Sequence, residues 1–427
     1  MIVRARAVQT NLSEEFRGTR DGAQAEAILR KCVHCGFCLA TCPTYQLLGD
    51  ELDSPRGRIY LVKQVLEGHA PTRATQRHLD RCLTCRNCET TCPSGVDFGT
   101  LIDIGRRIVE QRVERPAPQR AARWLLREGL TSSALGPAVR MGNVARPLLP
   151  QALQSKMPSA ASVESLTKGW PARVHDRKML LLAGCVQPHL LPNINRATAR
   201  VLDAAGIQTL IASGAGCCGA IRAHLADQQG ALADMRRNID AWWPYVEASS
   251  HRPRAEAIVM NASGCGVTVK EYANYLAHDS AYAHKAQHIS QYTRDLCEIV
   301  VDLVPLLRER LSLPKVPRIA MHLPCTLQHG QKLTGTLESV LRSLGFDVQV
   351  AQREHHLCCG SAGTYSLLEP KLAAELRDRK LEQLRAVHAP LIVSANIGCI
   401  QHLQSGTHIP VRHWIEVLDD LLIAAKQ

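Results

Sequence analysis

Cysteines are the residues of this chain best suited to chemistry, because its 427 residues include 17 of them. Eight lie in two copies of the pattern C-x2-C-x2-C-x3-C-P, one from Cys32 to Pro43 and the other from Cys82 to Pro93. Three thiolates at this spacing can hold one iron–sulfur cluster in a tight loop, while the fourth, beside the proline, ligates the other cluster. The spacing therefore predicts two adjacent [4Fe–4S] clusters that transfer electrons.

Because the fourth cysteine of each motif ligates the cluster of the other motif, the expected ligands of both clusters can be named. The first cluster takes Cys32, Cys35, Cys38 and Cys92, and the second takes Cys82, Cys85, Cys88 and Cys42. Zinc is the alternative, since four thiolates also make a closed tetrahedral site. Zinc ribbons, however, use paired C-x2-C knuckles across a longer gap. His34 lies inside the first loop, where four cysteines already suffice, and Arg56 and Arg58 either tune a cluster, bind a partner or are solvated.

A second set of eight cysteines belongs to a larger repeat with a period of about 140 residues. Its members are Cys185, Cys217, Cys218 and Cys265 in the first unit and Cys325, Cys358, Cys359 and Cys399 in the second. They follow predicted strands, and the carboxyl ends of parallel strands form the crevice where α/β sites are built. We therefore expect the thiols of each unit to converge on a further cluster or thiol site, with plain buried thiols as the alternative.

Other residues near these cysteines leave alternatives open. His189 and His329 each lie four residues after the first cysteine of a unit, so each either orients or replaces a ligand or is a surface histidine at a helix start. The run 214–219 fits G-x-G-x-x-G, but its counterpart in the second unit keeps only Cys-Cys-Gly, which argues against dinucleotide binding. Cys297 has no counterpart and is expected in the core.

The elements that position these residues follow from periodicity. Ser54 and Pro55 start a helix that ends near Gly68, and a second helix starts near Asp97. Further along, short apolar runs predict strands at Met179–Ala183, Ile207–Ala212, Ala257–Asn261, Arg318–Leu323, Phe346–Val350 and Leu391–Ser394. Helical patterns lie between these runs, so we predict parallel βαβ units.

The predicted fold is α+β, with a helical ferredoxin-like two-cluster domain followed by two tandem α/β units. A stretch without cysteines from Pro93 to Gly184 separates the two parts. The expected ranges are 1–115 for the cluster domain, 116–177 for short helices and a linker, 178–315 for the first cysteine-rich unit and 316–427 for the second.

Composition excludes several classes of protein. The chain is 45% hydrophobic and 21% charged, as in ordinary globular proteins, and no apolar run approaches the ~18 residues that span a bilayer. The first residues lack the pattern of a secretory signal, so we expect reduced cysteines in the cytosol. The net charge of +12 indicates a solvated basic surface, or docking to an acidic partner or anionic lipid. Nucleic-acid binding is not expected, because aromatic residues are few and no recognition motif is present.

With these motifs in place, the chain resembles the iron–sulfur subunits of glycolate dehydrogenase, also called glycolate oxidase. These belong to a wider group of redox subunits that pair a two-cluster ferredoxin with tandem CCG domains. The resemblance is carried by the cluster loops and by the segments 43–53, 55–60, 238–244, 262–266, 324–329, 358–365 and 411–416. The segments 240–244 and 326–329 are more discriminating than the loops, which many electron-transfer subunits share.

The resemblance implies a complex in which FAD-containing partner subunits oxidise glycolate to glyoxylate. This chain would carry no catalytic residue and would pass the electrons to the respiratory chain, with quinone as the expected acceptor. The complex would lie in the cytoplasm, peripherally on the inner membrane. Related lactate or glycerol-3-phosphate dehydrogenases, or a heterodisulfide-reductase-like thiol/disulfide enzyme, are the alternatives.

One departure from the wider group bears on the cofactor count. CCG domains of that group that hold an extra cluster end in C-x2-C, whereas Thr268 and His402 stand at the last position here. Each unit therefore has four cysteines instead of five. Two clusters are expected from the N-terminal motifs, and a further cluster in the CCG units is left open.

Overall fold

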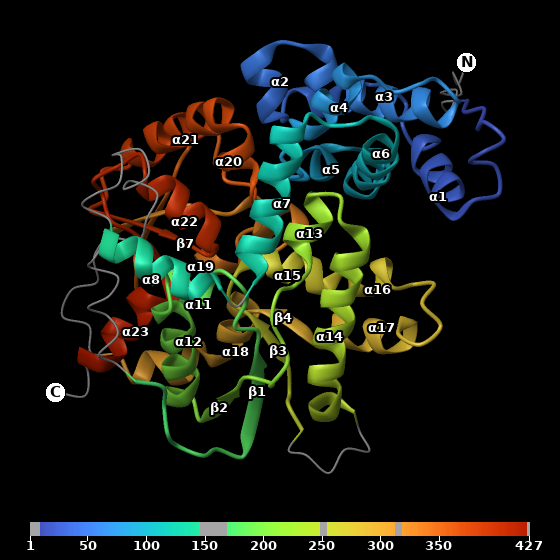
Figure 1. Ribbon diagram of the computed structural model, residues 1–427. Coiled ribbons are helices and arrows are strands. Elements are labelled where there is room, and N and C mark those ends of the chain that lie inside the picture. The colour runs from blue at the N-terminus through green and yellow to red at the C-terminus, as the bar shows by residue number, and fades with distance from the viewer. Residues whose placement is uncertain (1–8, 133, 146–168, 248–253, 312–317, 425–427) are drawn as a thin grey trace, which may run out of the picture.

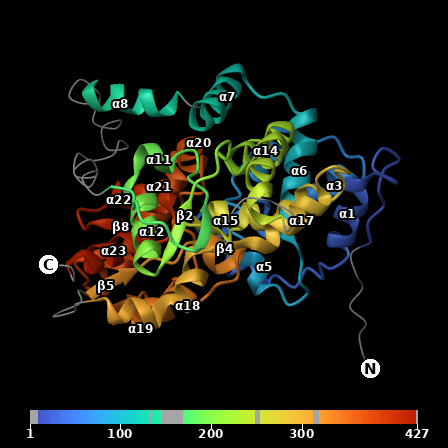
Figure 2. The same ribbon diagram turned by 90° about the horizontal axis from the view of Figure 1, so that it is seen from below.

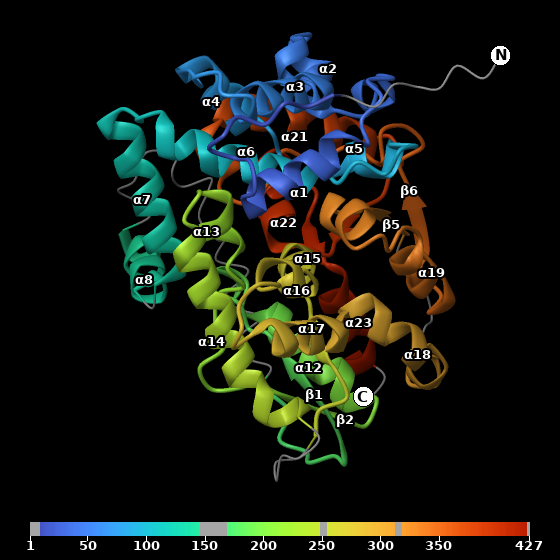
Figure 3. The same ribbon diagram turned by 90° about the vertical axis from the view of Figure 1, so that its right-hand side faces the viewer.

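The computed structural model describes residues 9–132, 134–145, 169–247, 254–311 and 318–424. A helical N-terminal domain is followed by two α/β units, each with a four-stranded parallel sheet. The N-terminal helices lie as a layer across one end of both units (Figure 1 and Figure 3). This architecture confirms the fold class predicted from the cysteine repeats and from the alternation of strands and helices.

The N-terminal domain packs short helices around the cluster loops. Its described α-helices are α1 (Arg20–Leu29), α2 (Pro43–Leu48), α3 (Pro55–Leu66), α4 (Arg73–Asp80), α5 (Asn87–Thr91) and α6 (Phe98–Arg112). The two predicted helices are α3, which Ser54 caps by accepting from the N–H of Gly57, and α6, which Asp97 caps. These two helices can approach because residue 105 is glycine: a Cβ there would lie 2.4 Å from Val62.

The first α/β unit contains a sheet in the order β2-β1-β3-β4 with all neighbours parallel. Its strands are β1 (Arg177–Leu181), β2 (Ile207–Leu210), β3 (Ile258–Met260) and β4 (Thr293–Asp295). Its helices are α11 (Gln187–Leu190), α12 (Asn193–Ala204), α13 (Ala220–His224), α14 (Gln228–Val246), α15 (Ser263–Lys270), α16 (Tyr272–Tyr275), α17 (Ala283–Tyr292) and α18 (Leu296–Glu309).

The second unit repeats this topology in the order β6-β5-β7-β8, again all parallel. Its strands are β5 (Arg318–Met321), β6 (Asp347–Val350), β7 (Leu391–Ser394) and β8 (Val411–His413). Its helical segments are the π-helical turn η5 (Thr326–Gly330), α19 (Thr336–Ser343), α20 (Tyr365–Leu368), α21 (Pro370–Arg385), α22 (Ile397–Gln404) and α23 (Trp414–Ala424).

The six predicted strands are confirmed, with ends that differ by at most two residues, and two further strands are present among the described residues. The unpredicted strands, β4 and β8, are three residues long, carry charged or imidazole side chains and lie at the edge of their sheets. Their local sequence therefore lacks the apolar run or alternation that marks a strand.

The two units share one continuous hydrophobic core. The last helix of each unit packs on the first long helix of the other, α18 on α19 and α23 on α12. Arg200 of α12 pairs with Asp419 of α23 at 2.6 Å, and Asn193 donates to Glu416 at 2.8 Å. The two units therefore pack into one body. The domain ranges predicted from the sequence remain predictions, and they follow the repeats along the chain.

Helices α7 (Ala117–Thr131) and α8 (Leu135–Ala145) lie along one side of the units (Figure 2). They contact α13 and α11 respectively. They agree with the short helices predicted after residue 116, while most of the predicted linker lies outside the described residues. Among the described helices, none combines the length and the apolar character needed to cross a membrane.

A buried histidine couples the two units and makes stability depend on pH. His413 is fully buried; its Nε2–H donates to the carbonyl of Asn261 at 2.9 Å, and Nδ1 accepts from the N–H of Ile415. Burial lowers the pKa of His413 from 6.5 to about 3. The unfolded chain therefore binds this proton at a higher pH than the folded chain does.

We expect stability to fall as the pH drops from 6.5 towards 3, by about 1.4 kcal/mol per pH unit from this group. The substitution His413→Gln should reduce that slope, which urea unfolding at pH 7, 6 and 5 would measure. The exposed His408 supplies the control substitution. An unchanged slope in His413→Gln would contradict the prediction.

Candidate metal centres

The eight cysteines of the N-terminal motifs gather around two neighbouring cavities. One is lined by Cys32, Cys35, Cys38 and Cys92. The other is lined by Cys42, Cys82, Cys85 and Cys88. The four thiols of each predicted ligand set thus line one cavity, three from one motif and the fourth from the other, and Cys88 of the second set also reaches the first cavity. Cys88, Pro55 and Phe98 line both cavities, so only a thin wall of side chains separates them.

The two cysteine loops share an unusual backbone conformation. His34 and Gly36 in the first loop have φ values of 54° and 85°, and Thr84 and Arg86 in the second have 50° and 59°. Backbone turns of this kind direct successive N–H groups into a concave site for negative charge. In the second loop the N–H of Thr84 donates to Cys82 Sγ at 3.4 Å.

The donor sets fit iron–sulfur clusters. Burial raises the pKa of Cys38 to about 11 and also raises the pKa values of Cys85 and Cys88. Such thiols do not ionise by themselves near neutral pH, but a metal takes them as thiolates and offsets the cost of their burial. Four sulfur donors per cavity, with loop amides beside them, are what a [4Fe–4S] cluster needs.

Arg58 is a buried cation beside the second cavity. It is 1% exposed, and its Nη1 lies 3.9 Å from Cys42 Sγ and donates to Thr44 Oγ1 at 3.1 Å. Its charge is balanced by Asp53, which is fully buried and also pairs with Arg81 at 2.8 Å. Of the roles left open for Arg58, solvation is excluded, and a tuning role beside Cys42 fits this position.

The first cavity opens to the surface. Cys35 is exposed, and the neighbouring Phe37 is 62% exposed. His34 is exposed as well, and Arg56 lines the cavity while pairing with Glu51 at 2.7 Å. This edge of the molecule is therefore the place where another protein can come closest to the first set of thiols.

The second cavity lies beneath the second α/β unit. Leu83 and Cys85 from its loop pack in one cluster with Cys358, Tyr365 and Cys325. Asn87 also bridges the two parts, since its Nδ2 donates to the carbonyl of Thr41 at 3.0 Å and to that of His356 at 3.3 Å. The N-terminal domain thus sets its second group of thiols directly against the thiols of the second unit.

In the first unit the four thiols converge as predicted. Cys185 is next to Cys217, and Cys218 is next to both Cys217 and Cys265. The hydrogen bond with Cys217, together with burial, raises the pKa of Cys185. The Cys217 thiol also contacts the carboxylate of Asp234, whose pKa burial raises.

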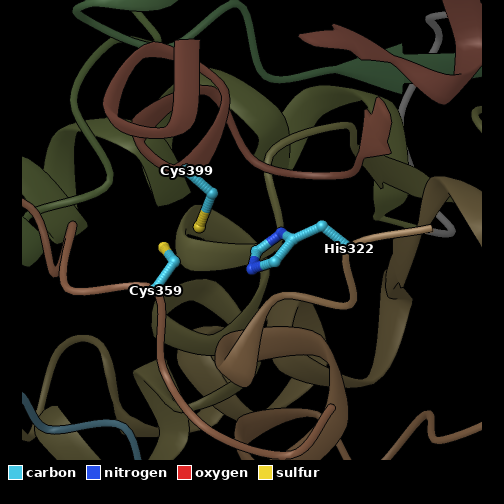
Figure 4. A group of neighbouring side chains, drawn as sticks. All are labelled: His322, Cys359 and Cys399. Carbon is cyan, nitrogen blue, oxygen red and sulfur yellow. The ribbon is translucent and has the colours of Figure 1, made fainter. Parts of the chain in front are cut away.

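In the second unit the four thiols also converge, and a histidine joins them. Cys325 Sγ lies 3.8 Å from Cys358 Sγ, and Cys359 is next to both Cys358 and Cys399. The ligand atoms of His322, Cys359 and Cys399 all lie within 4.8 Å of one another, and the three side chains point towards a common space (Figure 4). The four thiols were predicted, but His322 was not.

The two histidines singled out by their spacing play other roles. His329 is buried, and both its ring nitrogens are engaged: Nδ1 with Thr90 Oγ1 and Nε2 with the carbonyl of His356, each at 2.9 Å. It therefore fastens the N-terminal domain to the second unit and is neither a ligand nor a surface residue. His189 lies against Gly136 of α8. His402 Nε2 contacts the carbonyl of Ala373 at 3.0 Å.

The sequence signal for His322 is its position three residues before Cys325 at the end of a predicted strand, but only the fold brings it to Cys359 and Cys399. The remaining cysteine, Cys297, is fully buried in the shared core as expected. The glycine of each Cys-Cys-Gly is required by backbone packing: Gly219 and Gly360 have φ values of 91° and 88° and face the helices α14 and α21 closely. The glycines thus let a helix cross behind each thiol pair.

Comparison with known proteins agrees with these sites. Residues 28–96 match the 4Fe-4S dicluster domain family, and residues 179–270 and 319–404 each match the cysteine-rich domain family. The chain is 54% identical to the glycolate oxidase iron-sulfur subunit of Escherichia coli strain K12, over 97% of this chain and 99% of that protein.

Other relatives are more distant. A probable glycolate oxidase iron-sulfur subunit of Bacillus subtilis strain 168 is 28% identical over 92% of each chain. A subunit of the CoM/CoB fumarate reductase of Methanothermobacter marburgensis is 22% identical over 97% of this chain and 75% of that protein. Two cysteine-lined cavities, tandem cysteine-rich units and an end-to-end match together show that the chain belongs to the family of glycolate oxidase iron–sulfur subunits.

Proposed function

We propose that this chain is the electron-transfer subunit of a glycolate-oxidising dehydrogenase, with two [4Fe–4S] clusters held by Cys32, Cys35, Cys38 and Cys92 and by Cys82, Cys85, Cys88 and Cys42. One observation carries the proposal: the eight cysteines line two adjacent cavities, and each cavity contains the four thiols of one ligand set. Clusters held there would supply one-electron transfer. The protein's part is to hold the thiolates, direct amide N–H groups at them and limit access of water.

The proposed partners follow from the family and from the surface. FAD-containing subunits would oxidise glycolate to glyoxylate, and the open first cavity with the exposed Phe37 offers a place for redox contact. The acceptor would be the quinone of the respiratory chain. Cytoplasmic, peripheral association with the inner membrane is supported by the net charge of +12 and by Trp124, Leu125 and Met141, all more than half exposed on α7 and α8.

The experiment that tests this function separates the subunit from its complex. The isolated chain, purified without oxygen, should be brown, give reduced-cluster EPR signals and show no oxidation of glycolate with an artificial acceptor. Adding the flavin-containing partner subunits should restore glycolate-dependent reduction of its clusters. A glycolate activity in the isolated chain, or cluster reduction by lactate or glycerol 3-phosphate but not by glycolate, would refute the assignment.

A further inference from the structure

The two cysteine-rich units have the same topology but differ in the groups that surround their thiols. We propose that the second unit, and not the first, holds a third metal centre, an iron–sulfur cluster in which His322 is a ligand beside Cys359 and Cys399. This goes beyond the proposed function, which needs only the two N-terminal clusters. It rests on two differences between matched positions of the repeat and on the donor set of the second unit.

The first difference is the histidine itself. His322, at the end of β5, is 2% exposed, and its Nδ1 lies 2.9 Å from Ser394 Oγ at the end of β7. A metal-binding histidine is usually held in this way, with one ring nitrogen hydrogen-bonded so that the other faces the metal. That arrangement leaves Nε2 towards the sulfurs of Cys359 and Cys399 (Figure 4). In the first unit Leu182, also three residues before the first cysteine, occupies the matching position.

The second difference is a buried cation. Lys380 of α21 is 3% exposed, and its Nζ donates to the carbonyls of Glu354 and His355 in the loop before Cys358. Its ammonium group is close enough to Cys359 and Cys358 for their charges to favour it. A lysine buried this deeply needs a negative partner. Thiolates bound to a metal would supply that charge.

The first unit has an amide at the place of this lysine. The two helices can be aligned at Ala231 and Ala373, whose carbonyls face the glycines of the two Cys-Cys-Gly turns. Asn238 and Lys380 each follow seven residues later and therefore occupy matching positions. Asn238 is fully buried and donates to the carbonyl of Cys217 at 2.7 Å. The amide satisfies the loop without adding charge. The carboxylate of Asp234 lies beside Cys217, but it is paired with Arg237 at 2.9 Å and with Arg222 at 3.4 Å. At the matched position the first unit therefore has a neutral amide, whereas in the second unit the buried ammonium of Lys380 favours thiolates.

The third observation identifies the metal. Cys325, Cys358, Cys359, Cys399 and His322 offer five donor atoms, more than the four that a structural zinc ion takes. Asn396 Nδ2 also donates to Cys399 Sγ at 3.5 Å, as an outer-shell group does for a bound thiolate. Cys325 and Cys358 pack with Cys85 of the second N-terminal cavity. A redox-active group at this place would lie next to the second N-terminal site and would extend the series of redox centres.

The test is metal content of the full chain, purified and reconstituted without oxygen. Two [4Fe–4S] clusters account for about eight iron atoms per chain. We expect more iron than this in the unmodified chain and a return to about eight in His322→Ala and Cys359→Ala. The matched substitution Cys218→Ala in the first unit should leave the iron content unchanged. Zinc in place of the additional iron, no additional iron, or equal losses from Cys218→Ala and Cys359→Ala would overturn the proposal.

Ligation by the imidazole has its own readout. The unmodified chain should show nitrogen hyperfine coupling in pulsed EPR that changes when the protein is labelled with ¹⁵N-histidine. His322→Cys should retain the additional iron but lose that coupling, and it guards against a His322→Ala protein that fails to fold. His402→Ala is the control histidine in the same unit. If the coupling persists in His322→Cys, His322 is not the ligand. Loss of only the third signal would leave the two-cluster function intact.

Discussion

Replacing Cys42 by Ser should remove the second cluster, and replacing Cys92 should remove the first, although each residue belongs to the other motif. The physical reason is the crossing of the fourth cysteines between the two cavities. Each substitution should lower the iron content by about four atoms and remove one reduced-cluster EPR signal.

The identity of the lost cluster can be read from matched variants. The spectrum of Cys42→Ser should match that of Cys85→Ser, and the spectrum of Cys92→Ser should match that of Cys35→Ser. Cys297→Ser, at a buried cysteine that lines neither of the two N-terminal cavities, is the control and should keep both signals. If Cys42→Ser matched Cys35→Ser instead, each motif would hold its own cluster and the crossing would be wrong.

Replacing Asp53 by Ala should cost about 3–5 kcal/mol of stability. The carboxylate is fully buried and pairs with Arg58 and Arg81, so its removal leaves the buried guanidinium of Arg58 without a counter-charge. Because Arg58 lies against Cys42, the second cluster should be lost early during unfolding. Urea unfolding followed by the cluster absorbance would measure both effects.

Two variants sharpen this prediction. Glu51→Ala breaks the half-exposed pair with Arg56 in the same region and should cost only about 0–1 kcal/mol. The double substitution Asp53→Ala with Arg58→Met removes both charges and should recover part of the loss. If Asp53→Ala and Glu51→Ala lowered the free energy of unfolding equally, removal of Asp53 would not leave an uncompensated buried charge on Arg58, and the prediction would be wrong.

The two cysteine-rich units share their strand order and their Cys-Cys-Gly turn. Leu182 and Asn238 stand where the other unit has His322 and Lys380, and these positions can change without altering the backbone. The difference between the units therefore lies in side-chain chemistry at the strand ends and behind the thiol pair.

Much of this protein could be determined from its sequence by itself. The cysteine stride and the Cys-Pro ends act within single loops, so they predict the cluster type, while the crossing of the ligand sets is predicted from the two-cluster pattern. Ser54 with Pro55 and Asp97 mark helix starts by local capping, and six apolar runs mark strands by burial. Each of these signals depends on neighbours a few residues away.

Only the tertiary structure decided the rest. His322 meets Cys359 and Cys399 because the sheet order places β5 beside β7, and a strand's neighbours cannot be read from its own residues. The spacing of four selected His329 instead, yet packing against Thr90 engages both its nitrogens. The sequence left solvation, partner binding and cluster tuning open for Arg58, and the fold decides against solvation by burying it against Asp53 and the carbonyl of His78. Several side chains have equivalent local sequence signals, and the long-range contacts of the fold decide which of them take part in a site.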